Sequence, residues 1–142
     1  SNSELINIDV TPIKVPHRDE YSETAGYIIA GKKKKALFIP DIDKWDKWDK
    51  KLIDLVKDFD YLLLDATFYN SEEINRDISE IPHPLVSETI DLLNSLSKEN
   101  KGKVYFIHMN HTNPMLDPNS ELSKSIIMKG FNIARLGQKL YL

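Results

Sequence analysis

The chain has no cysteine among its 142 residues. That absence excludes disulfide bonds, zinc sites built on thiolates and a cysteine nucleophile, and it fits a reducing compartment. The chain also lacks any apolar run near the roughly 20 residues that a membrane helix needs, and it shows no signal peptide. We therefore expect a cytoplasmic protein that has no membrane partner.

Positive charge is scarce as well. Nineteen basic residues are outnumbered by 22 acidic ones, and the formal net charge is -3. This balance argues against nucleic acid as the main partner. The single basic cluster, Lys32 to Lys35, lies between two strand-like segments, so a solvated hairpin turn is a better interpretation of it than a phosphate-binding patch. With 41% hydrophobic residues, the chain can fold as one domain around a single core.

Short apolar runs bounded by turn residues predict the strands. These strands cover Gly26 to Ala30, Ala36 to Ile39, Tyr61 to Leu64, Val104 to Ile107, Phe131 to Ala134 and Lys139 to Leu142. Leu5 to Val15 is expected to form two shorter pieces around Pro12, because proline interrupts the pairing of a strand. The first two strands should form a hairpin around the lysines, and the last two a closing hairpin around Gly137.

Apolar residues at helical spacing predict three helices. They run from Trp45 to Phe59, from Val86 to Leu96, and from a cap at Asn119 or Ser120 to Lys129. Trp45 and Trp48 are expected to anchor the core, Asn100 to Gly102 to end the second helix, and Gly130 to end the third in a left-handed conformation. The order of elements predicts an α/β (α+β) fold with a mixed sheet.

Three of the expected strands end in a side chain that could bind a metal. Asp41 follows the strand ending at Ile39, Asp65 follows Leu64, and His108 follows Ile107. Histidine nitrogen and carboxylate oxygen without sulfur suit zinc, manganese or iron in a catalytic site. The alternative is structural: the histidines form hydrogen bonds in loops, and the aspartates cap the following helices. Asp43, just before the Trp45 stripe, fits such a cap better than a ligand.

The segment Val104 to Pro114, VYFIHMNHTNP, has the highest density of such groups. His108, Asn110, His111 and Asn113 follow the strand at the point where the chain leaves the sheet, and two of the four histidines lie there. In open α/β sheets the chemistry lies beyond the carboxyl ends of the strands. This segment therefore marks the expected site.

Five blocks carry a resemblance to a known family: VPHRDEYSETAGYII, LFIPDIDKW, LLLDATFYN, RDISEIPHP and YFIHMNHTNP. Together they resemble the carboxyl-terminal half of a metallo-β-lactamase-fold hydrolase, in the branch containing pyrroloquinoline quinone biosynthesis protein B. The resemblance implies half of an αββα sandwich, with helices on one face of the sheet. It also implies that His17, Asp41 and His108 bind zinc, manganese or iron, and that Asp65 and Asn110 support these ligands from behind.

The family's His-x-His-x-Asp-His motif is absent from the chain. The metal site implied by the resemblance is therefore incomplete here, and we expect weak zinc binding and no hydrolysis by this chain alone. Phosphodiesterase-like relatives use a further histidine near the substrate. His83 resembles it and His111 is the other candidate, and either can donate a proton to a leaving alkoxide.

Three functions remain open from the sequence. The first is part of a metal-dependent hydrolase that acts on a small-molecule ester or phosphodiester. The second is a non-catalytic module for assembly or metal-linked binding, and the third is a role related to quinone cofactor biosynthesis. In each case the apolar strands imply a partner that covers the second face of the sheet, either the missing amino-terminal half or a second copy in a homodimer.

Overall fold

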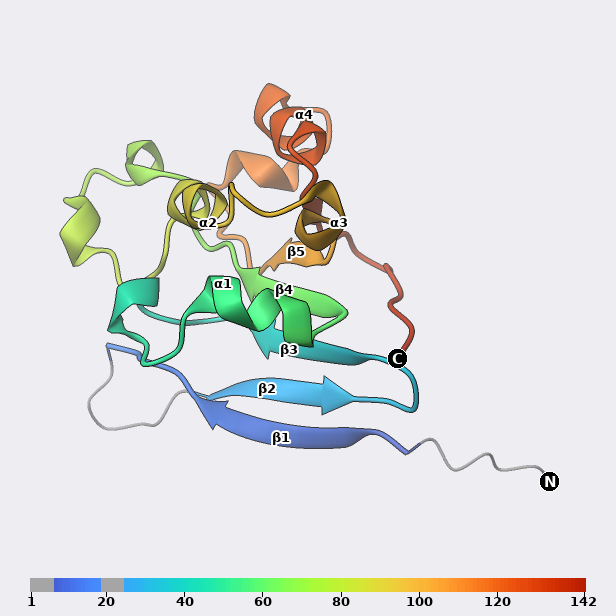
Figure 1. Ribbon diagram of the computed structural model, residues 1–142. Coiled ribbons are helices and arrows are strands. Elements are labelled where there is room, and N and C mark those ends of the chain that lie inside the picture. The colour runs from blue at the N-terminus through green and yellow to red at the C-terminus, as the bar shows by residue number, and fades with distance from the viewer. Residues whose placement is uncertain (1–6, 19–24) are drawn as a thin grey trace.

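The computed structural model describes residues 7–18 and 25–142, which form a six-stranded sheet with the strands in chain order (Figure 1). The strands are β1 (Asp9–Lys14), β2 (Ala25–Ala30), β3 (Lys35–Ile39), β4 (Tyr61–Asp65), β5 (Val104–Ile107) and β6 (Asn132–Ile133). β1, β2 and β3 pair antiparallel, and β3 to β6 pair parallel. This arrangement confirms the expected α/β fold with a mixed sheet.

The antiparallel part confirms the hairpin around the lysines, whose side chains at 32–35 are exposed. β1 differs from the expectation because it is one strand that runs through Pro12. β1 pairs only with β2 and lies at the edge of the sheet, where a residue without an N–H group is tolerated. Leu5 and Ile6, at the start of the expected segment, lie outside the described residues.

The helices are short. They are α1 (Leu52–Leu55), α2 (Val86–Leu92), α3 (Lys98–Lys101) and α4 (Glu121–Met128), with 3-10 turns η1 (Trp45–Lys47), η2 (Val56–Asp58), η3 (Ser71–Glu73), η4 (Ile78–Glu80) and η5 (Pro114–Leu116). The longest described helix has 8 residues, so none of them could cross a bilayer. As expected, Ser120 caps α4 through the N–H of Ser123, and Gly130 follows it at a φ of 102°.

The continuous helix expected from Trp45 to Phe59 is wrong. The segment is broken into η1, α1 and η2, because Trp48 and Lys51 have extended backbone conformations. The buried face expected for this segment is nevertheless confirmed, because Trp48, Leu52 and Val56 are buried in one cluster and Trp45 packs against it. Asp43 caps no helix: its carboxylate accepts hydrogen bonds from the Lys44 N–H and from Lys47 Nζ.

Two further expectations are corrected. The helix starting at Val86 ends at Leu92, and a separate helix, α3, occupies the region expected to be its exit. The closing hairpin is wrong, because β6 pairs parallel with β5 and the residues after it form no strand. Gly137, at a φ of 81°, turns this tail, and it ends where the Tyr61 hydroxyl donates a hydrogen bond to the Tyr141 carbonyl oxygen.

The helices lie on one face of the sheet. Each step from β3 to β6 joins parallel neighbours in the same direction, and such crossovers are right-handed, so the connecting helices fall on the same side. Figure 1 shows α1, α2 and α3 on that side. Under them lies the core, where Leu37, Leu62, Leu64 and Phe106 are at most 1% exposed.

The opposite face carries a row of apolar side chains that no described helix covers. Cross-strand pairing aligns Tyr27 with Phe38, Phe38 with Leu63, and Leu63 with Tyr105. Tyr27 is 37% exposed, the other three are half-buried, and none of the four belongs to the core cluster. We call these four residues the open face.

Candidate metal centre

The carboxyl ends of β3, β4 and β5 bring most of the expected site residues together. Ligand atoms of Asp41, Asp65 and His83 all lie within 4.8 Å of one another. His17 Nε2 lies 3.2 Å from Asp41 Oδ2, and His108 Nδ1 lies 3.3 Å from the Thr67 hydroxyl oxygen. The cluster is thus assembled from a loop before β2 and from the residues that follow three neighbouring strands.

Backbone hydrogen bonds hold these loops against one another. The Asp43 N–H donates to the Pro16 carbonyl oxygen at 2.8 Å, which fixes the loop containing His17 beside the end of β3. The Trp48 indole N–H donates to the Lys14 carbonyl oxygen at 3.1 Å and secures the same loop from the core side. His17 therefore reaches the cluster because the hydrophobic core fixes the strand before it.

Asp65 is fully buried, and both of its oxygens are occupied. Oδ1 accepts from the N–H and the hydroxyl of Thr67, at 2.9 and 2.7 Å. Oδ2 accepts from the Ile42 N–H at 3.1 Å and lies 2.8 Å from His83 Nδ1. A carboxylate has about four acceptor sites, so little capacity remains for a metal. Asp65 consequently organises its neighbours, and its geometry fits the supporting role expected from the sequence.

His83 lies between two prolines in the loop that returns from η4 to α2. Its ring packs edge-on against Phe68 with the ring centroids 5.9 Å apart. Burial lowers the pKa of His83, but the hydrogen bond that its ring donates to Asp65 and the charges of Asp65, Asp41 and Asp43 outweigh this effect and raise the pKa above its ordinary value. A histidine that holds its proton more firmly is suited to the proton-donor role.

Asp41 differs from Asp65 in having an unused oxygen. Its Oδ1 is buried and, within the described part of the chain, accepts no hydrogen bond. His83 Nδ1 lies 3.3 Å from that atom, but the same nitrogen is closer to Asp65 Oδ2 and its proton points there. A buried carboxylate oxygen without a donor is costly unless a cation occupies the space beside it.

His108 has an unusual backbone. Its φ of 64° is the only positive value at a non-glycine position among the described residues. The turn is held from both sides, because the Ala66 N–H donates to the Ile107 carbonyl oxygen at 2.8 Å and the Asn110 N–H donates to the Thr67 carbonyl oxygen at 2.9 Å. A strained residue fixed by its surroundings is typical of a functional position.

The remaining residues of the segment after β5 have different positions. Asn110 supports the site through its backbone, while its side chain donates to the Thr112 hydroxyl oxygen. His111 is exposed and forms no hydrogen bond or ion pair with the described members of the cluster. The structure therefore brings His83 into the cluster and leaves the other proton-donor candidate outside it.

Two residues outside the expected ligands build this site: Asn113, which the sequence analysis placed in the segment after the last central strand, and Thr67, which it did not single out. Asn113 is buried, and its amide donates to the Ala66 carbonyl oxygen at 2.7 Å, which fastens the segment after β5 to the end of β4. Thr67 contacts Asp65, His83 and His108 through one hydroxyl group. A threonine two residues after a strand-end aspartate was the available signal, because that spacing favours a local hydrogen-bonded turn.

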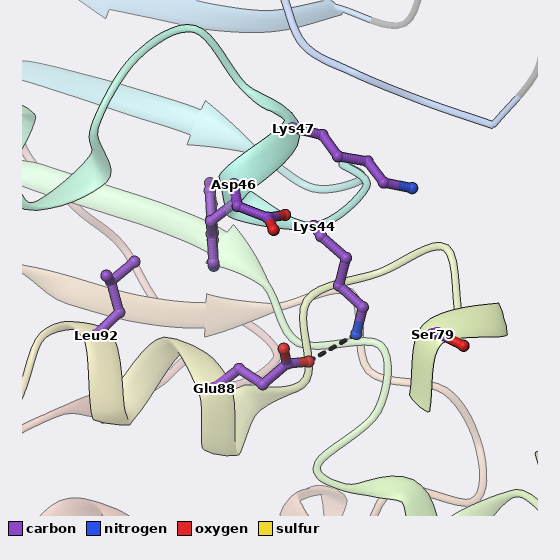
Figure 2. Close-up of a pocket in the computed structure, with 7 residues that line it drawn as sticks. Lys44, Asp46, Lys47, Ser79, Glu88 and Leu92 are labelled. Carbon is purple, nitrogen blue, oxygen red and sulfur yellow. Dashed lines mark hydrogen bonds and ion pairs between the residues drawn. The ribbon is translucent and has the colours of Figure 1, made fainter. Parts of the chain in front are cut away.

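A separate hollow lies between η1, η4 and α2, and Figure 2 shows the side chains around it. Lys44 Nζ lies 2.6 Å from Glu88 Oε1, and Lys47 Nζ lies 3.1 Å from Asp43 Oδ2. Both cations that face the hollow are already neutralised by a carboxylate. None of the histidines of the cluster lines it, so it offers no second metal centre.

Comparison with known protein families identifies the fold. The family described as the β-lactamase superfamily domain matches residues 3–109. The chain belongs to this family. The matched region includes His17, Asp41, Asp65, Thr67, His83 and His108, so the whole cluster lies within the family domain.

Two relatives carry the name coenzyme PQQ synthesis protein B. The one from Pseudomonas putida (strain GB-1) is 26% identical over 103 residues, which cover 66% of this chain and 33% of the relative. The one from Acinetobacter baumannii (strain ACICU) is 26% identical over 148 aligned positions, which cover 97% of this chain and 48% of the relative. The chain thus spans about half the length of the relatives it matches, or less.

A solved structure shows the same fold. Zn²⁺-bound PqqB from Methylobacterium extorquens superposes with a TM-score of 0.73 at 22% identity, covering 95% of this chain and 50% of that one. This similarity establishes the β-lactamase superfamily fold for the chain. It also agrees with the resemblance to the PqqB-containing branch that the five sequence blocks indicated.

Proposed function

We propose that the chain forms part of a metal-dependent hydrolase centre that acts on a phosphodiester or another ester-like bond. The observation that carries the proposal is the buried Asp41 Oδ1, which accepts no hydrogen bond from the described residues and belongs to a group of possible ligand atoms with Asp65 and His83. These nitrogen and oxygen donors suit zinc, with manganese or iron as alternatives. The residues therefore fit a metal ion.

In this proposal Asp41, His17 and His108 would hold the metal, while Asp65, whose oxygens accept four hydrogen bonds, would keep His83, Thr67 and the loop at Ile42 in place beside it. A divalent ion supplies Lewis acidity, polarising an ester oxygen and making water a stronger nucleophile. His83, whose pKa is raised, then donates a proton to the leaving alkoxide. His111 is the second candidate for that step, and its exposed position would require the substrate to reach it from outside the cluster.

The proposal includes a partner layer on the open face. The chain covers 48% of the Acinetobacter protein and 50% of the Methylobacterium chain, so comparable lengths of both relatives have no counterpart in it. Either a polypeptide equivalent to that unmatched part or a second copy of this chain would cover the open face. The first option would also supply further ligands, because the His-x-His-x-Asp-His motif does not occur in this sequence.

Zinc titration calorimetry tests the placement of the metal. We expect weak binding by the 142-residue chain, abolished in His17→Ala, Asp41→Asn and His108→Ala and kept in Asp49→Asn, a matched change at an exposed aspartate. Tight, stoichiometric binding that survives all three site variants would show that the metal lies elsewhere.

Hydrolysis is tested with bis-p-nitrophenyl phosphate. We expect no appreciable turnover by this chain alone, and metal-dependent turnover once the unmatched half of the relatives is supplied as a second polypeptide. His83→Ala should then lower kcat more than His111→Ala does. Metal-dependent turnover by the 142-residue chain alone would contradict the incomplete-site argument.

A role related to quinone cofactor biosynthesis is the second candidate. It is favoured by the similarity to two proteins named coenzyme PQQ synthesis protein B, at 26% identity each. Binding of a quinone cofactor to the assembled protein, measured by a change in the cofactor's absorbance, would favour this function. Loss of that binding in Asp41→Asn would place it at the same centre.

A further inference from the structure

The Thr67 hydroxyl lies at the centre of the cluster. Its oxygen is 2.7 Å from Asp65 Oδ1, 3.3 Å from His108 Nδ1 and 3.4 Å from His83 Nδ1. Thr67 is only 9% exposed and Asp65 is fully buried, whereas His108 is exposed, so the contact with His108 lies at the solvent-facing side of the cluster. One hydroxyl group therefore connects the buried carboxylate with a histidine from another strand end.

Proton counting fixes the direction of these hydrogen bonds. A hydroxyl group has one proton to donate, and an ionised carboxylate can only accept. The short contact to Asp65 Oδ1 therefore takes the proton of Thr67. Toward His108 the Thr67 oxygen can only accept, so the proton in that contact belongs to His108 Nδ1. In the neutral ring, Nε2 is then left with its lone pair free.

Asp65 also fixes the tautomer of His83, in this case through a direct hydrogen bond. His83 Nδ1 lies 2.8 Å from Asp65 Oδ2 and donates to it, which leaves Nε2 as the second nitrogen of that ring. The Thr67 backbone is also fixed, because its N–H donates to Asp65 Oδ1 and its carbonyl oxygen accepts from the Asn110 N–H. With the backbone fixed, the hydroxyl can turn away from His108 only by giving up its own hydrogen bond to Asp65 Oδ1.

We propose that Thr67 is a positioning residue that holds His108 in the Nδ1–H tautomer by relaying the negative charge of Asp65, which would leave Nε2 of His108 available as a metal ligand. The inference rests on the proposed function only where it assigns Nε2 of His108 to a metal. Histidine ligands generally donate their second ring N–H to a carboxylate or carbonyl oxygen. Here the carboxylate acts through an intervening hydroxyl group.

The tautomer is measured by long-range ¹H–¹⁵N NMR of the metal-free chain at about pH 9, well above the ordinary histidine pKa of about 6.5. We expect the Nδ1–H form of His108 in the wild type and in Thr67→Ser, which keeps the hydroxyl. In Thr67→Val, which has nearly the same shape without it, the Nε2–H form should become the major species. A wild-type chain in the Nε2–H form, or an unchanged tautomer in Thr67→Val, would overturn the proposal.

Zinc affinity provides the second readout. Loss of a supporting hydrogen bond behind a metal-binding histidine weakens metal binding by roughly 10- to 100-fold. We expect a loss of that size in Thr67→Val, and recovery to within about threefold of wild type in Thr67→Ser. If the wild-type chain binds no zinc even at millimolar concentration, the proposed metal function fails, while the tautomer measurement still decides the role of Thr67. If Thr67→Val does not fold, the tautomer found in the wild type and in Thr67→Ser decides it.

Discussion

The two faces of the sheet carry side chains of similar hydrophobicity but bury them to different extents. On the helix-covered face, Leu62 and Phe106 are fully buried in a continuous core. On the open face, Leu63 and Tyr105 are their immediate chain neighbours but remain partly exposed and lie outside that core. Side chains alternate between the faces of a strand, so adjacent residues of equal hydrophobicity have different surroundings.

This difference in burial suggests separate tests of folding stability, on the covered face, and of partner binding, on the open face. The covered face contains the core, whereas the four side chains of the open face are half-buried or exposed and have no described helix over them. The cluster of histidines and aspartates lies where both faces end, beyond the carboxyl ends of β3, β4 and β5. A change on one face should therefore affect folding, and a change on the other should affect partner binding.

The largest expected effect contrasts two adjacent leucines. Leu62→Ala removes a fully buried side chain and should lower the free energy of unfolding by about 2–5 kcal/mol. Leu63→Ala removes a half-buried one from the open face and should cost about 1 kcal/mol or less when measured on the monomer. Urea denaturation of both variants at low protein concentration measures the contrast. Equal losses would show that the second face is packed within this chain.

The two faces also show what the sequence can predict. Continuous apolar runs located β3, β4 and β5 and implied burial on both faces, but they could not reveal which face the chain covers itself. That depends on the common direction of the crossovers, which places every helix on one side. The expected strand after Gly137 failed because the edge of the sheet is already occupied by β6, which pairs parallel with β5.

The candidate site was predictable to a similar extent. Strand ends pointed to Asp41, Asp65 and His108, because parallel strands bring their carboxyl ends together. The different states of the two aspartates were not predictable, since two of the four hydrogen bonds of Asp65 come from Ile42 and His83 in other loops, and the unused oxygen of Asp41 depends on the same packing. The hydrogen bonds of Thr67 to Asp65 are local and could have been expected, but its contact with His108 depends on a distant loop.

Self-association is the next test of the contrast. We expect the chain alone to form a homodimer through the open face, and Leu63→Lys to weaken it on the order of 100-fold, because a cation would be buried without a partner. Lys124→Glu, on the exposed side of α4, is the control and should leave the dimer intact. Sedimentation velocity at micromolar concentration measures the species. A monomeric wild type with a cooperative thermal transition would refute the dimer.

At the edge where the faces meet, the two aspartates should respond differently. Asp65→Asn disturbs a fully buried carboxylate with four hydrogen bonds and should lower stability by about 1–3 kcal/mol. Asp41→Asn removes charge from a crowded acidic site whose Oδ1 has no donor, so stability in EDTA should change by about 0.5 kcal/mol or less. Thermal denaturation of both aspartate variants, with and without zinc, measures these effects. Only the wild type and the Asp49→Asn control should gain stability from zinc. A strongly destabilised Asp41→Asn would mean that this oxygen has a structural partner.

The smallest expected effect isolates the strain at His108. Both His108→Gly and His108→Ala remove the ring and its contact with Thr67, but only glycine adopts a φ of 64° at no steric cost. The left-handed conformation costs other residues roughly 1–2 kcal/mol, and part of that advantage is offset because glycine is more flexible in the unfolded chain. We therefore expect His108→Gly to be more stable than His108→Ala by about 1 kcal/mol in urea denaturation, with zinc binding lost in both. If the alanine variant is as stable as the glycine variant, the backbone at this position is not strained, and the turn after β5 is set by its neighbours' hydrogen bonds alone.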